Sequence, residues 1–187
     1  MPRFVLVLLL AFAAPNPLLA QTGSGSHKPA SKQQSLDYFA GTWALEVHMK
    51  GGPLSGIVFS GTEHNEWVPG GSLLLSHQEG VTPLASGGIS ILAYNASNKT
   101  YTYHAVKSTG ESEDLRGSFE GNTWTWTNDG LGDNNAPKIR LIIQELSAQS
   151  YGLKFETSSG GHEWSTIMEG KANKALPSRR QDVAFRR

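Results

Sequence analysis

The feature that most constrains the fold is an alternation of apolar and polar residues, which recurs in short runs along most of the chain. The clearest run follows Gly41. Apolar side chains occupy every second position in it, and the positions between them are small or polar: Trp43, Leu45, Val47 and Met49 against Ala44, Glu46, His48 and Lys50. Because side chains of an extended strand point alternately to opposite faces, this run predicts a strand with one buried face.

Further runs of this kind follow, separated by short segments rich in glycine, proline and asparagine. Together they predict ten strands, near residues 42–50, 56–67, 72–79, 88–94, 100–107, 113–119, 123–127, 139–146, 151–157 and 163–169. The segments between them have the composition of hairpin turns, which join antiparallel neighbours. A short helix is predicted at residues 35–40, and Gly41 ends it.

Each predicted strand carries one apolar line at every second position, so the whole sheet has a single dry face. The pairs that define these lines include Ile57 and Phe59, Leu73 and Leu75, Ile89 and Ile91, and Tyr101 and Tyr103. Sequential strands without long crossovers favour a closed barrel over a two-layered sandwich, because closure removes the unpaired edges. We therefore predict an all-β fold, a single antiparallel up-and-down barrel of about ten strands with a short N-terminal helix.

The segment that leads into the first strand contains FAGTW, residues 39–43, and resembles the start of lipocalin-like, calycin-type barrels. That resemblance implies that Trp43 plugs the closed end of the barrel. Four further segments, EWVPGGSLLLSHQEG, GGISILAYNASNKTYTYHAVKSTGE, GSFEGNTWTW and GGHEWSTIMEGKANK, are similar to the domain-of-unknown-function 1579 family of bacterial proteins. This second resemblance covers residues 36–173 and implies a lipocalin-like barrel that is frequently exported and has no established activity.

The chain departs from lipocalins proper after its last predicted strand. The resemblance implies an arginine there that covers the tryptophan, but Glu169, Gly170 and Lys171 occupy this region. A lysine is expected to take the covering role over the indole ring, because an ammonium group is attracted to an aromatic face.

Both ends of the chain differ from the predicted barrel. Residues 1–20 combine a positive start, an apolar run at residues 4–14 and a small residue before Gln21, which is the pattern of a secretory signal peptide. This run is shorter than the ~20 residues that cross a bilayer as a helix, so no transmembrane segment is expected after signal removal. After the signal peptide we predict three segments. Residues 21–34 form a flexible leader, residues 35–173 form the barrel, and residues 174–187 form a basic, disordered tail.

These segments predict an exported protein, periplasmic or secreted. Its basic tail is expected to contact an anionic surface weakly, since clustered lysine and arginine are attracted to acidic lipid. A solvated terminus without a partner is the alternative.

Charge and composition exclude several classes of function. Residues 21–170 hold nine basic and fifteen acidic side chains, net −6, whereas residues 171–187 hold six basic and one acidic, net +5. A body without a broad basic surface predicts no nucleic-acid partner. The chain has no cysteine, so it has no disulfide framework and no thiol nucleophile. The histidines lack metal-binding spacing and no catalytic motif is present, so no metal, cofactor or catalytic residue is predicted.

Polar residues that continue the apolar lines mark the candidate ligand site. Glu63 and Asn65 continue the line of the second predicted strand, His77 and Glu79 that of the third, and Glu145 that of the eighth. A few polar groups in an apolar interior are typical of a small-molecule pocket. The alternative is that these residues lie at strand ends open to water. With the inward aromatic residues added, the predicted ligand-binding residues are Trp43, Phe59, Glu63, His77, Tyr103, Trp124, Trp126 and Phe155.

These patterns predict a protein that binds a small hydrophobic or amphipathic ligand inside the barrel. Two alternatives remain open. One is a barrel enzyme or haem-type protein that uses an inward histidine or glutamate. The other is a structural or interaction protein whose core is filled, because barrels of this size either fill with side chains or hold one small ligand.

Overall fold

The computed structural model describes residues 33–82, 85–129, 137–159 and 163–175. The predicted signal peptide (1–20), most of the leader (21–34) and most of the basic tail (174–187) lie outside the described residues. The elements are η1 (Gln33–Phe39), β1 (Gly41–Met49), η2 (Gly52–Leu54), β2 (Val58–Trp67), β3 (Leu73–Thr82), β4 (Ala85–Asn95), β5 (Thr100–Lys107), β6 (Ser112–Glu120), β7 (Thr123–Thr127), β8 (Lys138–Ser147), β9 (Ser150–Ser158) and β10 (Ser165–Lys174).

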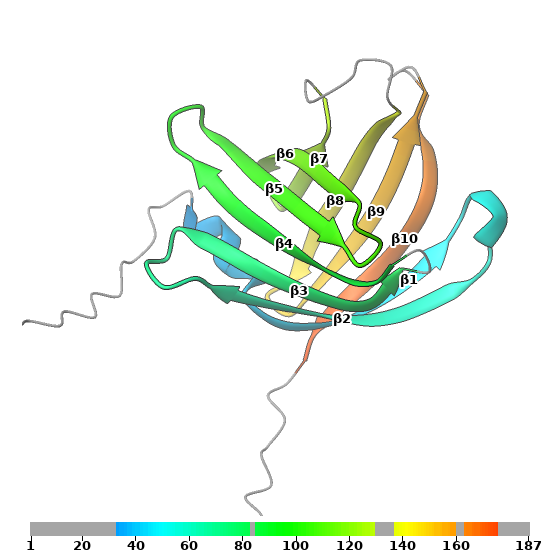
Figure 1. Ribbon diagram of the computed structural model, residues 1–187, viewed down its shortest axis with the longest axis horizontal. Coiled ribbons are helices and arrows are strands. Elements are labelled where there is room, and N and C mark those ends of the chain that lie inside the picture. Colours follow the sequence, from blue (N-terminus) through cyan, green and yellow to red (C-terminus); the bar gives the residue numbers. More distant parts are fainter. Residues whose placement is uncertain (1–32, 83–84, 130–136, 160–162, 176–187) are drawn as a thin grey trace, which may run out of the picture.

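The ten strands of the described chain form one closed barrel (Figure 1). Every strand pairs antiparallel with its neighbours in sequence, and β10 returns to pair with β1. This confirms the predicted up-and-down barrel. The helix predicted at residues 35–40 is the 3₁₀ helix η1, and the described part of the chain contains no helix with the length and apolarity needed to span a bilayer.

One end of the barrel is closed by η1 and by the tryptophan that opens β1. Trp43 is fully buried, and its indole N–H donates to the backbone oxygen of Phe39 at 2.7 Å. The covering lysine is Lys174, which lies opposite Trp43 on β10 and places Nζ 5.1 Å from the centroid of the indole ring. The tryptophan plug expected from the sequence is therefore present, and its lysine comes from the end of the last strand.

Further aromatic rings fill the space next to this plug. Trp124 and Trp126 of β7 are buried and lie parallel, with ring centroids 5.9 Å apart. Phe119 stacks on Trp124 at 4.4 Å, and the indole N–H of Trp124 donates to Glu145 Oε1 at 2.8 Å. The closed end is therefore a solid aromatic core, in which the indole N–H groups of Trp43 and Trp124 both have acceptors.

The junction of β1 and β10 depends on a glycine. Gly170 pairs with Val47 of β1 and with Leu153 of β9. A Cβ atom at this position would overlap the backbone oxygen of Glu46 and would lie 3.0 Å from the Cα of Val47. The absence of a side chain here allows β10 to approach β1 closely, and the barrel closes along this line.

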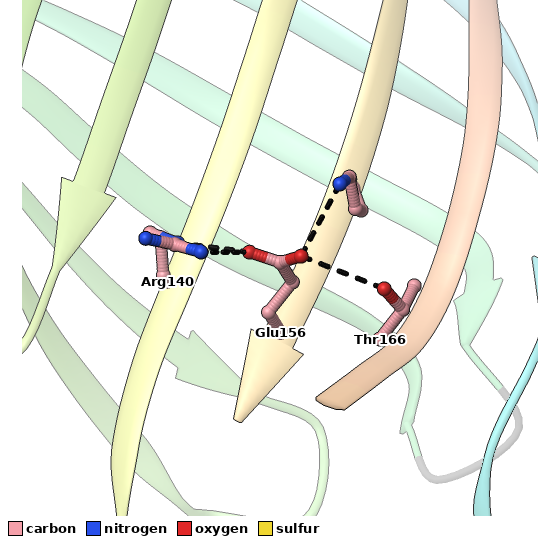
Figure 2. A network of polar contacts seen from close by, with 4 residues as sticks. Arg140, Glu156 and Thr166 are labelled. Atoms are coloured by element: carbon pink, nitrogen blue, oxygen red, sulfur yellow. Dashed lines mark hydrogen bonds and ion pairs between the residues drawn. The ribbon is translucent and has the colours of Figure 1, made fainter. Parts of the chain in front are cut away.

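A polar network ties β8, β9 and β10 together on the outer face of the barrel (Figure 2). Glu156 lies between Arg140 and Thr166, and accepts hydrogen bonds from Arg140 Nε at 2.8 Å and Nη2 at 2.5 Å. Lys154 Nζ forms an ion pair with the other carboxylate oxygen of Glu156, Oε1, at 3.2 Å. Burial opposes ionisation, but the hydrogen bonds from Arg140 and Lys154 outweigh it and hold the pKa of Glu156 below its ordinary value. The outer wall is therefore stabilised by charged contacts as well as by the strand ladder.

The structure reverses the predicted faces of β3. His77 and Glu79 are exposed, whereas Ser76 is fully buried and Gln78 faces the interior. The predicted inward orientation of His77 and Glu79 is therefore wrong. Residues 73–75 are three consecutive leucines, so both faces of this strand begin with apolar residues and the apolar line does not identify the buried one.

The faces of β4 are reversed for a related reason. Ile89 and Ile91 are 48% and 37% exposed, while Ser90 and Leu92 are buried. Ser90 pairs with Ser76 in the antiparallel register, and paired residues point to the same side of a sheet. Once Ser76 faces inward, Ser90 does so too, and the two isoleucines lie outside.

Candidate ligand-binding cavity

The barrel encloses a cavity of about 280 Å³ between the aromatic plug and the opposite end. Its lining residues come from β1 to β6 and from β8 to β10. The walls are mainly aliphatic, with Leu45 and Val47 on β1, Ile143 on β8 and Leu153 on β9. Such a cavity removes apolar surface of a guest molecule from water, which is the main source of affinity for small apolar ligands.

Glu63 is the acidic group on the inner part of the cavity lining. It lies on β2 opposite Trp43 of β1 and Gln78 of β3. Its Oε1 atom accepts hydrogen bonds from Asn65 Nδ2 at 2.8 Å and from Ser76 Oγ at 3.3 Å, and the side chains of Gln78 and Tyr151 also hydrogen-bond the carboxyl group. Neutral donors from three elements of the wall therefore surround this carboxyl group.

Burial acts strongly on the titratable groups around Glu63. Loss of water contact raises the pKa of Glu63 above its ordinary value of 4.5, although the hydrogen bonds to its carboxyl group act in the opposite direction. Burial also raises the pKa values of Tyr103 and Tyr151, and the nearby charge of Glu63 adds to both shifts. Burial therefore favours the neutral forms of these three groups.

A second group of charged residues lies at the open end. Lys107, Glu111 and Glu113 all line the cavity there, and Lys107 Nζ lies 3.9 Å from Glu111 Oε2. Burial raises the pKa of Glu113 above 4.5, while the charge of Lys107 lowers it and that of Glu111 raises it further. The mouth is therefore polar and the wall between the mouth and Glu63 is apolar.

The structure brings three of the eight predicted ligand-binding residues to the cavity: Glu63, Tyr103 and Phe155. Trp43, Trp124 and Trp126 belong to the aromatic plug. Phe59 faces inward beside Val47, but it is not among the described residues that line the cavity. His77 lies on the outer face, as described above. The binding role of these residues stays a prediction.

The inward polar partners Ser76, Gln78 and Tyr151, and the mouth residue Glu113, are absent from the residues predicted to bind. A signal for two of them exists in the sequence. Glu63 and Asn65 occupy alternate positions, as do Ser76 and Gln78, and antiparallel pairing of the two strands places each polar pair beside the other. The polar residues of β2 and β3, rather than their apolar ones, identify the shared inner face.

The histidines and acidic residues do not gather around a candidate metal site in the described part of the chain. His48, His64, His77 and His104 lie on strands with their side chains on the outer face, and none of them lines the cavity. His104 Nδ1 is 2.5 Å from Asp114 Oδ1, and His64 Nδ1 is 2.9 Å from Thr42 Oγ1. The described residues therefore offer no inward histidine as a haem ligand.

Replacing Glu63 with glutamine is expected to make stability less dependent on pH. Because the folded-state pKa of Glu63 is raised, the wild-type protein loses stability as the pH rises from about 4.5 through that raised pKa, where the unfolded chain binds fewer protons than the folded one. Glutamine resembles the neutral carboxyl group, so Glu63→Gln removes this loss. Urea unfolding followed by tryptophan fluorescence between pH 4 and pH 8 measures the difference.

The matched control for this measurement is Glu79→Gln, because Glu79 is exposed on the outer face of the neighbouring strand. Its stability curve should run parallel to that of the wild-type protein. Glu113 contributes a shift of the same sign, but it is present in both proteins and cancels from the difference. Parallel curves for Glu63→Gln and wild type would contradict the buried position of this carboxyl group.

Comparison with known proteins agrees with the barrel. The family model described as Protein of unknown function (DUF1579) matches residues 28–174, and no curated protein matches the chain. The crystal structure of Rv2717c from M. tuberculosis is similar with a TM-score of 0.54 and 12% identity, over 80% of this chain and 100% of that one. A redesigned beta barrel is similar with a TM-score of 0.38 and 12% identity, over 75% of this chain and 94% of that one.

The likeness to Rv2717c concerns the fold alone, because proteins with one fold and so low an identity often differ in function. The match to the family model extends from before η1 to the last residue of β10 and so includes all the described helices and strands. The chain belongs to the family described as Protein of unknown function (DUF1579).

Proposed function

We propose that this protein binds a small hydrophobic or amphipathic molecule inside its barrel. The observation that carries the proposal is the cavity of about 280 Å³, which has aliphatic walls and a hydrogen-bonding group, Glu63, at its inner part. A guest with an apolar body and a polar end matches this division of the lining. Small-molecule sites typically combine an apolar surface with a few placed polar groups.

The size of the cavity limits the ligand. At ~30 Å³ for each water-sized group, the cavity has room for about nine or ten such groups. Burial of apolar surface stabilises a complex by roughly 25 cal/mol for each Å² removed from water, so a guest of this size gains several kcal/mol before entropic costs. The proposed ligands are therefore compounds with about ten non-hydrogen atoms, or larger ones that project from the mouth.

This proposal fits the described residues better than the two alternatives. A filled core is disfavoured because an open volume remains between the plug and the mouth. A haem protein with an inward histidine is disfavoured because no described histidine lines that volume. Glu63 remains as an inward acid, but the side chains that hydrogen-bond it are all neutral and no described histidine lines the cavity beside it.

Filling the cavity is expected to abolish binding of a short apolar probe. Ala105 is a buried lining residue on β5, and Ala105→Phe places a phenyl ring in the open volume. We expect the wild-type protein to bind 1-octanol in calorimetric titrations with a negative heat-capacity change, which marks burial of apolar surface. Ala105→Phe should weaken this binding at least about tenfold.

Ala44→Phe is the matched control, because Ala44 is an exposed alanine on the outer face of β1. It adds the same ring and should leave octanol affinity unchanged. Native mass spectrometry of protein refolded without ligand gives a second measure, as one octanol adduct for each chain. Equal binding by Ala105→Phe and wild type would show that the probe does not occupy the barrel, and no binding by the wild type would contradict the proposed function.

A further inference from the structure

We propose that the ligand carries a protonated amine, and that this cationic nitrogen binds beside Glu63 at the inner part of the cavity. The inference rests on the proposed function and specifies its ligand class. It starts from a buried carboxyl group that has no cationic hydrogen-bond partner. Among the described residues, all the side chains that hydrogen-bond the Glu63 carboxyl group are neutral: Asn65, Ser76, Gln78 and Tyr151.

An ionised carboxylate is costly to keep away from water unless a cation pairs with it. Without a cation nearby the cost is lowered by binding a proton, and this is the direction in which burial shifts the pKa of Glu63. A ligand ammonium group in contact with the carboxyl group would favour the ionised form, and the carboxyl proton would pass to solvent. The buried carboxylate and the ligand cation would then compensate one another.

Hydrogen-bond acceptors are in surplus around this position. Asn65 Oδ1 is buried and has no hydrogen-bond partner among the described residues, although its Nδ2 donates both to Glu63 and to the backbone oxygen of Phe39. Tyr103 and Tyr151 lie close enough to Glu63 for its charge to raise their pKa values. Their hydroxyl oxygens accept hydrogen bonds and their rings attract cations. An ammonium group brings three donors and no acceptor, which suits such surroundings.

The charges of the whole lining also favour a positive ligand. Together with Glu63, the lining contains the carboxyl groups of Glu111 and Glu113, but only one ammonium group among the described residues, that of Lys107. Lys107 lies nearest to Glu111, at 3.9 Å, so it compensates the mouth rather than Glu63. When these carboxyl groups are ionised, the apolar walls concentrate their field within the cavity. The aliphatic surface between mouth and inner end accommodates the hydrocarbon part of the ligand.

Three probes of nearly equal length separate the amine from other polar ends: octylamine, 1-octanol and octanoate. An alkylammonium group resembles the side chain of lysine, whose pKa is about 10.4, so octylamine is charged at pH 7. Calorimetric titration of the wild-type protein at pH 7 should show octylamine binding at least about tenfold more tightly than octanol, and octanoate more weakly than either. Titrations in two buffers of different ionisation enthalpy, repeated below the raised pKa of Glu63, should show a proton released with octylamine and none with octanol.

Glu63→Gln tests the assigned residue. We expect this variant to bind octylamine roughly ten- to a hundredfold more weakly than wild type, whereas octanol should lose far less affinity, because glutamine still hydrogen-bonds a hydroxyl group but cannot pair with a cation. Glu79→Gln removes an equal charge from the outer face and should leave both affinities unchanged. If Glu63→Gln does not fold, the ratio of octylamine to octanol affinity in the wild-type protein decides the question.

The outcomes separate this inference from the proposed function. If octanol or octanoate binds the wild-type protein as tightly as octylamine does, the amine assignment is overturned and the binding function stands. If Glu63→Gln weakens all three probes equally, the role of Glu63 as an ionic partner is overturned. If no probe binds, both proposals fall together.

Discussion

Replacement of Trp124 by alanine is expected to lower the free energy of unfolding by about 3–5 kcal/mol, as is usual when a buried tryptophan is truncated. Trp124 is fully buried in the plug, with Phe119 stacked on it at 4.4 Å and Trp126 parallel at 5.9 Å. The closed strand ladder on all sides limits how far the surrounding wall can collapse into the space left. The variant also leaves the carboxyl group of Glu145 without its indole donor.

Chemical unfolding monitored by circular dichroism measures this loss, and the midpoint of thermal unfolding should fall by roughly 10 °C. Trp164→Ala is the control, because Trp164 is a partly exposed tryptophan on the outer face with Arg140 above its ring. That variant should lose about 1 kcal/mol, the usual scale for a cation–π pair near the surface. Equal losses at the two positions would contradict the assignment of Trp124 to a rigid core.

Replacement of Gly170 by alanine should destabilise the barrel by about 3 kcal/mol or more, at the upper end of the range for overpacked sites. The added methyl group overlaps the backbone oxygen of Glu46 and approaches the Cα of Val47. Backbone atoms cannot rotate away as the end of a side chain can, so β10 must move from β1 to make room. The pairing of β1 with β10 is then weakened along its length.

The control for this change is Gly152→Ala on the adjacent strand β9. A Cβ atom at Gly152 would have no neighbour nearer than 3.9 Å, so it should fit without displacement. Urea unfolding of the two variants compares them directly, and amide hydrogen exchange locates the effect. We expect Gly170→Ala to accelerate exchange of the amides that join β1 and β10. Similar stability of the two variants would be inconsistent with the close approach at Gly170.

The fold could be predicted because strand alternation and turn composition are local properties of the sequence. The run after Gly41, the similar runs that follow it and the hairpin segments between them are sufficient to indicate ten antiparallel strands. A closed barrel is favoured because it leaves no strand with an unpaired edge. The same local pattern fails at β3, where the leucines at 73–75 serve both faces, and at β4, where Ile89 and Ile91 are apolar but exposed. At these strands the face is decided by pairing with a neighbour and not by hydrophobicity.

The candidate site was less accessible from the sequence. Glu63 could be identified because it interrupts an apolar line, and its inward position is confirmed. The partners that surround it are spread over separate strands, and only the register brings Ser76 and Gln78 to its side. Cavity volume is also a property of the assembled wall. Whether Trp124 fills the plug or lines the cavity depends on its height along the barrel, which alternation does not specify.

The closure between β1 and β10 has a consequence for how the wall opens. Of the ten strand pairs in the described barrel, this is the pair whose members are not successive in the chain, so no hairpin returns them to register after they separate. It is held by its ladder, by Lys174 over Trp43, and by an ion pair of 2.5 Å between Lys50 and Glu169. The barrel can therefore open between β1 and β10 without distorting a hairpin turn, whereas separation of any other strand pair would strain the turn that connects its two strands.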